Sequence, residues 1–417
     1  MKALRFAIIG AGTAGLALAR MLAQQDIAVT IFEKAKTLDP IGAGLLLQPS
    51  GLAVFEHLGV LDQAIKFGAK VTGLEGQLPS GQLIVDSHYT QANAKYFGIG
   101  IHRATLCHIL QTALTPSNQV QWCMQHDVIN IRHTANEVIL TGKHQQLPFE
   151  AAFDAVIIAN GARSTLRPSQ WVKLDRPYPW GAAWSIVPEC PSLNREILHQ
   201  FYDRANIMMG VLPTGSIPQA NAQRLSSVFW SLPTTQLNHF LQQPKSVWLA
   251  QIQDRWPIVA EWLQQLSADS TQPMQWLSAH YRDVVMSQYG EGRMGVIGDA
   301  AHAMSPQLGQ GANMALLDAW ALSQALKLAT HYRQIEWSLL WQHYHQLRRS
   351  SIFMYQSLSR LLTPLYQSEL WWAGGLRNLM FSWMYHVPYL RKEMAITISG
   401  LKTNLLQQID YAEIAKK

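Results

Sequence analysis

Apolar residues gather in four short runs along the chain, and each run ends at glycine or polar positions. The runs cover residues 6–9, 28–32, 155–159 and 294–297. Strands that are buried on both faces of a parallel sheet have nearly continuous apolar sequence, so these runs predict parallel strands. Segments with apolar residues at helical spacing follow them, at 14–24, 52–67, 104–114 and 312–328. Strands that alternate with helices predict an α/β fold.

The stretch from 176 to 289 has a different pattern. Repeated prolines divide it into short β-like runs such as 182–187 and 207–212. This pattern predicts an antiparallel β-sheet domain inserted into the first domain, and a β-like segment at 71–98 is expected to join it. After residue 330 the spacing is mostly helical. The predicted division is 1–70, 99–175 and 290–330 for a Rossmann-like βαβ domain, 71–98 and 176–289 for the inserted domain, and 331–417 for a helical region.

Length and composition limit the function classes. The chain has 417 residues, enough for two domains, and its 48% apolar and 14% charged residues are typical of a folded protein. The net charge of +6 is scattered without a run of five or six Lys and Arg, so we expect no nucleic acid partner. Three cysteines, Cys107, Cys123 and Cys190, are too widely spaced for a disulfide framework or a metal-ligand pair. We therefore expect no metal site.

The first 23 residues resemble a signal peptide only superficially. Arg20 interrupts their apolar stretch, and glycines fall where a strand-to-helix turn needs them. No other segment has the length and purity of a membrane span. Together with the unpaired cysteines, this predicts a cytoplasmic protein.

The turn after the first predicted strand is rich in glycine. Gly10 permits a tight turn, Gly12 lets a diphosphate approach the backbone, and Gly15 permits close packing of helix on strand. The free amides and the dipole at the start of the following helix favour an anion there. This turn predicts a dinucleotide site, and by itself it does not separate FAD from NAD.

The second predicted strand ends at Glu33, which lies 18 residues after Gly15. A carboxylate at this place is positioned to accept hydrogen bonds from ribose hydroxyls. The candidate cofactor-binding residues of the first unit are Gly10, Gly12, Ala14, Gly15, Glu33 and Lys34.

Two later segments resemble a known family. Residues 293–313, RMGVIGDAAHAMSPQLGQGAN, closely resemble the GD motif of the group A flavoprotein monooxygenases, the para-hydroxybenzoate hydroxylase-like family. Residues 154–167, DAVIIANGARSTLR, resemble the DG motif of the same family. With the glycine-rich turn and the His102-Arg103 segment, the family's motifs occur in order from residue 6 to about residue 322. The resemblance implies an FAD-binding domain, an inserted substrate domain, and NADH or NADPH as electron donor.

The same resemblance implies roles for individual residues. Asp299 would accept a hydrogen bond from the ribityl chain, and Pro306 would lie near the reactive flavin edge. Glycines open the helix that starts at 312, and its positive end would stabilise negative charge on reduced flavin. Arg103 is a candidate for pairing with flavin phosphate or ribityl oxygens. The further candidate cofactor-binding residues are Arg103, Asp299, Gly309, Gly311, Ala312 and Asn313. We expect His302 to be a structural histidine rather than a catalytic base.

The DG segment departs from the family at one position. Asn160 stands where the family has aspartate, so a hydrogen-bonding carbonyl remains but the charge is lost. The candidates for a groove that takes the nicotinamide donor are Asn160, Gly161, Ser164 and Arg167.

Large side chains in the inserted domain are candidates for a substrate cavity. Trp184, Tyr202 and Met208 would form an aromatic and apolar wall suited to an aromatic or lipophilic substrate. At strand spacing such residues are more often core. Near the C-terminus, 370–398 combines many aromatic residues with helical spacing. Its functional interpretation is a membrane-surface helix or a substrate lid, and packing across the FAD domain is favoured over both.

These features predict an FAD-dependent monooxygenase. By resemblance, NAD(P)H reduces the flavin and a C4a-hydroperoxyflavin transfers one atom of O2 to an aromatic or lipophilic small molecule. One alternative is a flavin-dependent reductase or dehydrogenase of a lipophilic substrate, and another is a non-catalytic flavin-binding protein. The oligomeric state, monomer or dimer, stays open, as do a weak contact with a membrane surface and the choice between NADH and NADPH.

Overall fold

In a computed structural model of the whole chain, residues 4–38, 43–115, 117–218, 223–269, 274–332 and 334–416 are described. A six-stranded sheet holds the four runs that were predicted to be parallel strands. Its order is β18 (Gly290–Glu291), β19 (Met294–Val296), β12 (Ala155–Ile158), β1 (Arg5–Ile9), β2 (Ala28–Glu33) and β8 (Val120–Met124). All neighbours are parallel except β18 and β19. The central strands are fully buried, which explains their continuous apolar sequence.

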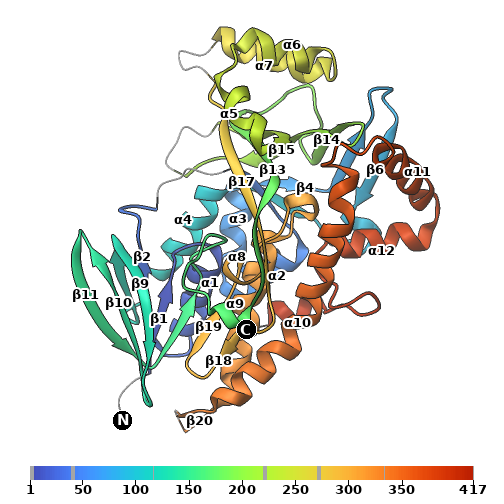
Figure 1. Cartoon of the computed structure of the whole chain (residues 1–417). Helices are drawn as coiled ribbons and strands as arrows, with labels where there is room; N and C mark the ends of the chain where they lie inside the picture. Colours follow the sequence, from blue (N-terminus) through green and yellow to red (C-terminus); the bar gives the residue numbers. More distant parts are fainter. Residues whose placement is uncertain are drawn as a thin grey trace.

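Helices cover this sheet as expected for an α/β protein (Figure 1). They are α1 (Thr13–Ala23), α2 (Pro49–Leu58), α3 (Leu61–Phe67), α4 (Arg103–Leu114) and α9 (Gly311–Ala329). Helix α1 packs against both α4 and α9. The α/β fold class is confirmed. One predicted helix, 52–67, is two helices instead, because Gly59 adopts a left-handed conformation with φ +74° and ends α2.

A second sheet has seven strands. Its order is β17 (Leu277–Met286), β13 (Val172–Pro188), β16 (Leu225–Pro233), β15 (Ile207–Gly215), β14 (Ile197–Asp203), β5 (Gly73–Gln77) and β6 (Leu83–His88). Neighbours are antiparallel except β14 and β5. The early segment and the long insertion therefore lie in one sheet. Smaller sheets are formed by β3 (Gly44–Leu47), β7 (Gly98–His102) and β4 (Ala69–Val71), and by β9 (His126–His133), β10 (Val138–His144) and β11 (Leu147–Phe153).

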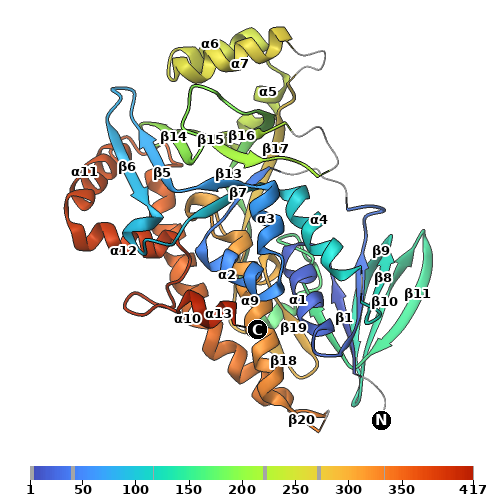
Figure 2. The same ribbon diagram turned by 180° about the vertical axis from the view of Figure 1, so that it is seen from behind.

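Three helices interrupt the inserted segment, which sequence patterning had assigned to strands alone. They are α5 (Thr234–Gln242), α6 (Lys245–Gln253) and α7 (Pro257–Asp269), and they lie beyond the seven-stranded sheet in both ribbon views (Figure 2). Four buried tryptophans, Trp230, Trp248, Trp256 and Trp262, form a separate core between these helices and the sheet. These helices cover one face of the sheet. The sequence pattern did not predict them, because short runs of apolar residues look alike in buried helices and in strands.

The chain ends in a helical region. It comprises α10 (Trp337–Leu362), α11 (Ala373–His386), α12 (Pro388–Ile398) and α13 (Tyr411–Ala415). Helix α10 packs on α9, whereas α11 contacts β6, α12 and the 3-10 turn η4 (Thr363–Leu365). The expected packing of the aromatic segment across the FAD domain is thus wrong for α11, which lies against the seven-stranded sheet. Within the described residues no helix is both long and apolar enough to cross a membrane.

Candidate functional site

The turn between β1 and α1 shows why three glycines are needed. A Cβ at Gly10, which has φ +106°, would lie 2.6 Å from the carbonyl oxygen of Ala159, and one at Gly15 would lie 2.0 Å from the carbonyl oxygen of Gly10. A Cβ at Gly12 would meet nothing within 4 Å. Two glycines therefore serve packing, while Gly12 leaves open space in front of α1. The N-terminus of α1 has no side-chain cap, so its amides are available to a phosphate.

Glu33 at the end of β2 holds this turn from the side. Its Oε2 accepts a hydrogen bond from the amide of Ala11 at 3.0 Å, and its Oε1 accepts one from the amide of Ala35 at 2.9 Å. The carboxylate is half-buried and keeps acceptor capacity toward solvent. Lys34 beside it is exposed, and Ala14 is buried under the turn.

Asp299 follows β19, where the backbone turns into the short helix α8 (Asp299–His302). Gly298 has φ +63°, and a Cβ there would lie 3.0 Å from the methyl group of Ala14. The carboxylate of Asp299 is exposed between two buried neighbours, and it has no hydrogen bond or ion pair among the described parts of the chain. Its Oδ1 lies 3.8 Å from the place of a Cβ on Gly311. An unpaired carboxylate thus faces the start of α9.

The chain from Pro306 to Gly311 forms the turn before α9. Pro306 begins the 3-10 helix η3 (Pro306–Leu308), and Gly309 closes it with φ +61°. Pro306, Gly309 and Gly311 are exposed. Asn313 is fully buried, so it supports this turn from the protein interior and does not face a ligand. Its Nδ2 donates to the carbonyl oxygens of Leu46 at 3.0 Å and of Gly309 at 3.1 Å.

Two glutamines that sequence reasoning missed complete this support. The Nε2 of Gln310 donates to the Oε1 of Gln48 at 2.7 Å and to the carbonyl oxygen of Ile398 at 2.8 Å. The Nε2 of Gln48 donates to the carbonyl oxygen of Leu308 at 3.1 Å. Both side chains are almost fully buried. They come from distant segments, so no local signal in the sequence links them.

A buried charge cluster ties α8 to α9. Oδ2 of Asp318 accepts hydrogen bonds from Nε2 of His302 at 2.6 Å and from the amide of Gly298 at 2.8 Å, and Oδ1 accepts one from Nε of Arg348 at 2.7 Å. Burial alone would raise the pKa of Asp318, but His302 and Arg348 hold it well below its ordinary value. His302 is buried within this cluster, which gives it a structural place.

The DG segment divides into an exposed and a buried half. Asn160 is exposed, and Gly161 has φ +83° with open space around it. Ser164 is buried and its Oγ accepts a hydrogen bond from the amide of Leu166 at 3.3 Å. Arg167 is buried too.

The guanidinium of Arg167 points inward. It donates to Asp175 at 2.5 Å and to the carbonyl oxygen of Ala300 at 3.2 Å. These bonds join the DG segment to β13 and to α8. Of the four candidates for the donor groove, Asn160 and Gly161 face solvent while Ser164 and Arg167 hold the backbone.

Arg103 is exposed at the first position of α4. His102 precedes it and caps the helix, because its Nδ1 accepts a hydrogen bond from the amide of Ala104 at 3.3 Å. Burial lowers the pKa of His102, which favours the neutral ring that this acceptor role requires. Arg103 is therefore free to reach a ligand while its neighbour is committed to the fold.

The aromatic candidates in the inserted sheet are all buried. Trp184 pairs across strands with Phe229. The hydroxyl of Tyr202 donates to Oε1 of Gln200 at 2.8 Å, and the Tyr202 ring packs against Tyr366 with Met208 in the same apolar cluster. The structure therefore places Tyr202 and Met208 under the C-terminal region, and Phe229, the cross-strand partner of Trp184, packs against the same cluster.

A cluster of hydroxyl groups lies directly before Pro306. The Oγ of Ser305 lies 2.7 Å from both the Oγ of Ser359 and the Oγ1 of Thr363. Tyr178 of β13 also hydrogen-bonds Thr363, and burial raises the pKa of Tyr178. The cluster joins the turn before α9 to α10 and to the seven-stranded sheet. Sequence reasoning did not identify any of its members.

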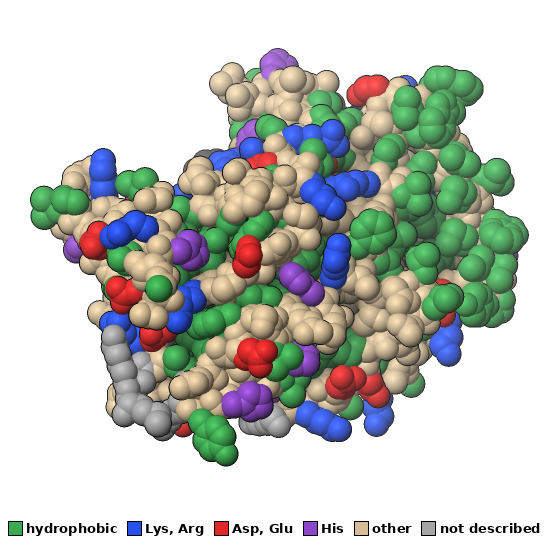
Figure 3. Space-filling model, turned by 60° about the horizontal axis from the view of Figure 1, so that its bottom comes forward, with side chains coloured by type: hydrophobic (Ala, Val, Ile, Leu, Met, Phe, Trp, Pro, Cys, Tyr) green, Lys and Arg blue, Asp and Glu red, His purple; other side chains and the backbone are tan. Residues whose placement is uncertain are grey.

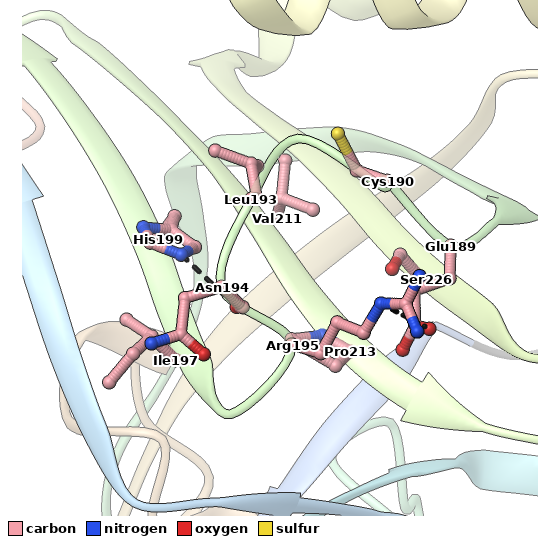
Figure 4. A pocket seen from close by; sticks show the side chains of 10 residues that line it. All are labelled: Glu189, Cys190, Leu193, Asn194, Arg195, Ile197, His199, Val211, Pro213 and Ser226. Carbon is pink, nitrogen blue, oxygen red and sulfur yellow. Dashed lines mark hydrogen bonds and ion pairs between the residues drawn. The ribbon is translucent and has the colours of Figure 1, made fainter.

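A small pocket lies elsewhere, on the seven-stranded sheet (Figure 4). Glu189, which binds Arg195 and Arg224, lines it together with His199 and Cys190. Its volume of about 10 Å³ has room for about one water molecule. It includes none of the residues around the β1–α1 turn or Asp299.

The residues around the two turns fit an FAD molecule. Gly12 leaves the space that a diphosphate needs, and Glu33 keeps acceptor capacity for a ribose. Asp299 supplies an unpaired carboxylate, and the exposed Gly311 opens α9, whose first amides no side chain caps.

Comparison with known proteins agrees with this fit. Residues 4–352 match the family described as FAD binding domain. The chain is 26% identical to 3-amino-4-hydroxybenzoate 2-monooxygenase of Streptomyces cremeus, over 76% of this chain and 77% of that protein. It is 24% identical to a 2-heptyl-3-hydroxy-4(1H)-quinolone synthase of Pseudomonas aeruginosa, over 89% and 92%. The crystal structure of p-nitrophenol 4-monooxygenase from Pseudomonas putida has the same fold, with a TM-score of 0.76 at 16% identity over 96% of this chain and 98% of that one.

Proposed function

The chain belongs to the FAD binding domain family of group A flavoprotein monooxygenases, and from this premise we propose that it uses NAD(P)H and O2 to hydroxylate an aromatic or lipophilic small molecule. The enzyme is an FAD-dependent oxidoreductase. The proposed division of labour follows the two sheets, with the cofactor on the six-stranded sheet and the substrate on the seven-stranded one. A cytoplasmic location, in keeping with three free cysteines, is part of the same proposal.

The observation that carries the proposal is the unpaired carboxylate of Asp299 beside the turn from Pro306 to Gly311. An unpaired carboxylate at the carboxyl end of a parallel strand is where ligands of open α/β sheets bind. The exposed turn beside it is held from below by Gln48, Gln310 and Asn313. A rigid, ligand-facing backbone supported in this way is what positioning of a reactive ring edge requires.

FAD, when bound, supplies the redox chemistry that takes reducing equivalents from a nicotinamide and activates dioxygen. The chain supplies position and electrostatics. In this proposal Gly12 and the start of α1 hold the diphosphate, Glu33 and Arg103 hold the nucleotide, and Asp299 holds the ribityl chain. The start of α9 favours negative charge next to Gly311.

The nicotinamide donor is proposed to approach along Asn160 and Gly161, the exposed half of the DG segment. Ser164 and Arg167 support that approach indirectly, because their side chains bind the protein itself. The side-chain amide of Asn160 can both donate a hydrogen bond to the nicotinamide dinucleotide and accept one from it.

Relatives guide the choice of substrate. Two of them are named for a hydroxybenzoate and a quinolone. We propose a substrate of the same kind, an electron-rich aromatic ring with at least one hydroxyl or carbonyl group. The hydroxyl cluster of Tyr178, Thr363 and Ser305 is proposed to lie at the polar end of the substrate cavity, because Ser305 adjoins Pro306.

The test is a screen of phenols, quinolones, quinone precursors and polyketide-like aromatics with the purified yellow protein. Substrate should accelerate NAD(P)H consumption, and 18O2 should place one labelled atom in the product. Accelerated consumption with an unlabelled, reduced or desaturated product would assign the chain to flavin reductases or dehydrogenases. Bound flavin that no nicotinamide reduces at a catalytic rate would instead indicate a binding protein.

A further inference from the structure

Helix α11 is fixed to the protein by one face only. A Cβ at Gly374 would lie 2.7 Å from the backbone of Arg204, and Phe381 is buried against Tyr366. Arg377 is fully buried and lies over the ring of Tyr202 at 5.0 Å. These contacts hold the helix firmly against the seven-stranded sheet, so α11 is not a free lid.

The opposite face of α11 is apolar and open. Leu376, Leu379, Met380 and Trp383 stand at positions i, i+3, i+4 and i+7 of one helix face, and 41%, 72%, 37% and 63% of their surfaces are exposed. In the turn before the helix, Leu370, Trp371 and Trp372 are exposed too, Trp371 by 89%. We name these seven residues the α11 surface.

The α11 surface is unlike the isolated apolar residues found on most proteins. Figure 3 shows apolar side chains gathered along one edge of the molecule, where Figure 1 places α11 and α12. A helix normally turns its apolar stripe toward the core, but here a second stripe faces water. A contiguous exposed patch of this kind marks an interaction site.

The charges around the surface indicate what covers it. From 369 to 393 the carboxylates stand only at the two ends: exposed Glu369 accepts a hydrogen bond from Asn206, and Glu393 pairs with Lys402. Arg391 and Lys392 are exposed on α12 and have no ion pair among the described residues. Arg360 near the end of α10 is exposed as well. Tryptophan with leucine, bordered by basic residues, is the composition of helices that lie in a lipid headgroup layer. We propose that the α11 surface docks the protein onto an anionic lipid bilayer.

A second copy of the chain is a poorer partner for this surface. A two-fold interface brings the same patch of both copies together. The carboxylates next to the surface in such an interface would be Glu369 and Glu393, and both already bind side chains of their own copy, Asn206 and Lys402, so Arg391 and Lys392 would gain no free carboxylate partner from the second copy's α11 surface. Phosphate headgroups pair such residues directly. The proposal concerns docking only, and it is independent of the reaction proposed above.

The experiment is flotation of the full-length holoprotein with vesicles of phosphatidylcholine alone or mixed with phosphatidylglycerol. The protein should float with the mixed vesicles and much less with the neutral ones. The double variant Leu379→Gln/Trp383→Gln should lose binding at least tenfold while its flavin content and unfolding midpoint stay those of the natural protein. The matched control Leu147→Gln/Leu328→Gln, which removes exposed leucines on β11 and α9, should bind unchanged.

The charge contribution has its own variant. Arg391→Gln/Lys392→Gln should weaken binding to the mixed vesicles about fivefold for each residue and leave the small binding to neutral vesicles as it is. Absence of binding to the mixed vesicles, or equal loss in the Leu147 and Leu328 control, would overturn the proposal. So would light scattering that finds a dimer which Leu379→Gln/Trp383→Gln converts to a monomer, since the surface would then be occupied by a second copy.

Discussion

His302 and Asp318 form a pair that is closed to solvent, with Nε2 of the histidine 2.6 Å from Oδ2 of the aspartate. The same oxygen accepts the amide of Gly298, the residue before Asp299. The pair therefore fixes the backbone that presents the candidate ligand carboxylate. The pair contributes to the candidate site by positioning Asp299, although neither the His302 nor the Asp318 side chain faces that site.

Asp318→Asn should destabilise the protein strongly. The substitution leaves Arg348 without its carboxylate in a buried place, and loss of one partner of a buried pair costs about 3–5 kcal/mol. Urea unfolding at pH 7 measures the difference. Ser338→Ala on the exposed face of α10 is the control, and equal stability of the two variants would contradict the structural role.

The contribution of Asp318 should also depend on pH. Its pKa is lower in the folded state than the ordinary 3.8, so the stabilisation is complete above that value and is lost as the pH falls below it. The stability difference between the natural protein and Asp318→Asn should therefore be constant from pH 7 to 5 and shrink in more acidic solution. A difference that grows on acidification would contradict this assignment.

Gly12→Ala and Gly15→Ala should fail in different ways. The added methyl group at Gly12 enters open space in front of α1, so FAD affinity should fall by roughly tenfold or more, about the effect of one lost hydrogen bond, while the fold survives. At Gly15 the methyl group meets a carbonyl oxygen, and overpacking should cost about 1–3 kcal/mol of stability. Flavin absorbance and thermal unfolding separate the two, with Gly375→Ala as the control in open space.

Asp299→Ala should release FAD without unfolding the protein. The carboxylate has no partner in the described structure, so nothing internal is lost with it. A hydrogen bond to a charged group contributes enough to change the dissociation constant of FAD by about 10- to 100-fold. Fluorescence titration of the apoprotein measures this, and unchanged affinity would remove Asp299 from the site.

Asn160→Asp should strengthen the binding of the nicotinamide donor by roughly tenfold, because a carboxylate accepts stronger hydrogen bonds than an amide. Flavin content should not change. Stopped-flow reduction by NADH and by NADPH gives the dissociation constant. Thr165→Asp adds the same charge nearby, and an identical effect of both variants would assign the change to charge alone.

Local sequence predicted much of the fold. The strands around Ile8 and Ile157 were recognisable because burial on both faces requires continuous apolar residues, and Gly12 was recognisable because a strand-to-helix turn has few solutions. Gln48 and Gln310 were not recognisable. Each is an ordinary polar residue in its own segment, and its partner lies some 260 positions away along the chain.

Local sequence also failed to predict how α11 packs, because its contacts are with distant segments of the chain. The spacing of Leu379 and Trp383 identified an apolar helix face correctly, but spacing carries no information on what the face meets. Only the placement of Gly374 and Arg377 against the sheet shows that the apolar stripe points away from the protein.

Two hydrogen bonds to the end of α12 have a consequence for synthesis on the ribosome. The side chain of Gln310 donates to the carbonyl oxygen of Ile398, and the amide of Ser50 donates to the carbonyl oxygen of Ser399. The hydrogen bond that joins the β1–α1 turn to Glu33 lies within the first 33 residues, and Ala159, against which Gly10 packs, is synthesised long before residue 399. The turn before α9 gains its last supports only after residue 399 has left the exit tunnel. The nascent chain should therefore retain flavin only after residue 399 has emerged, so truncation before α12 should yield a colourless protein.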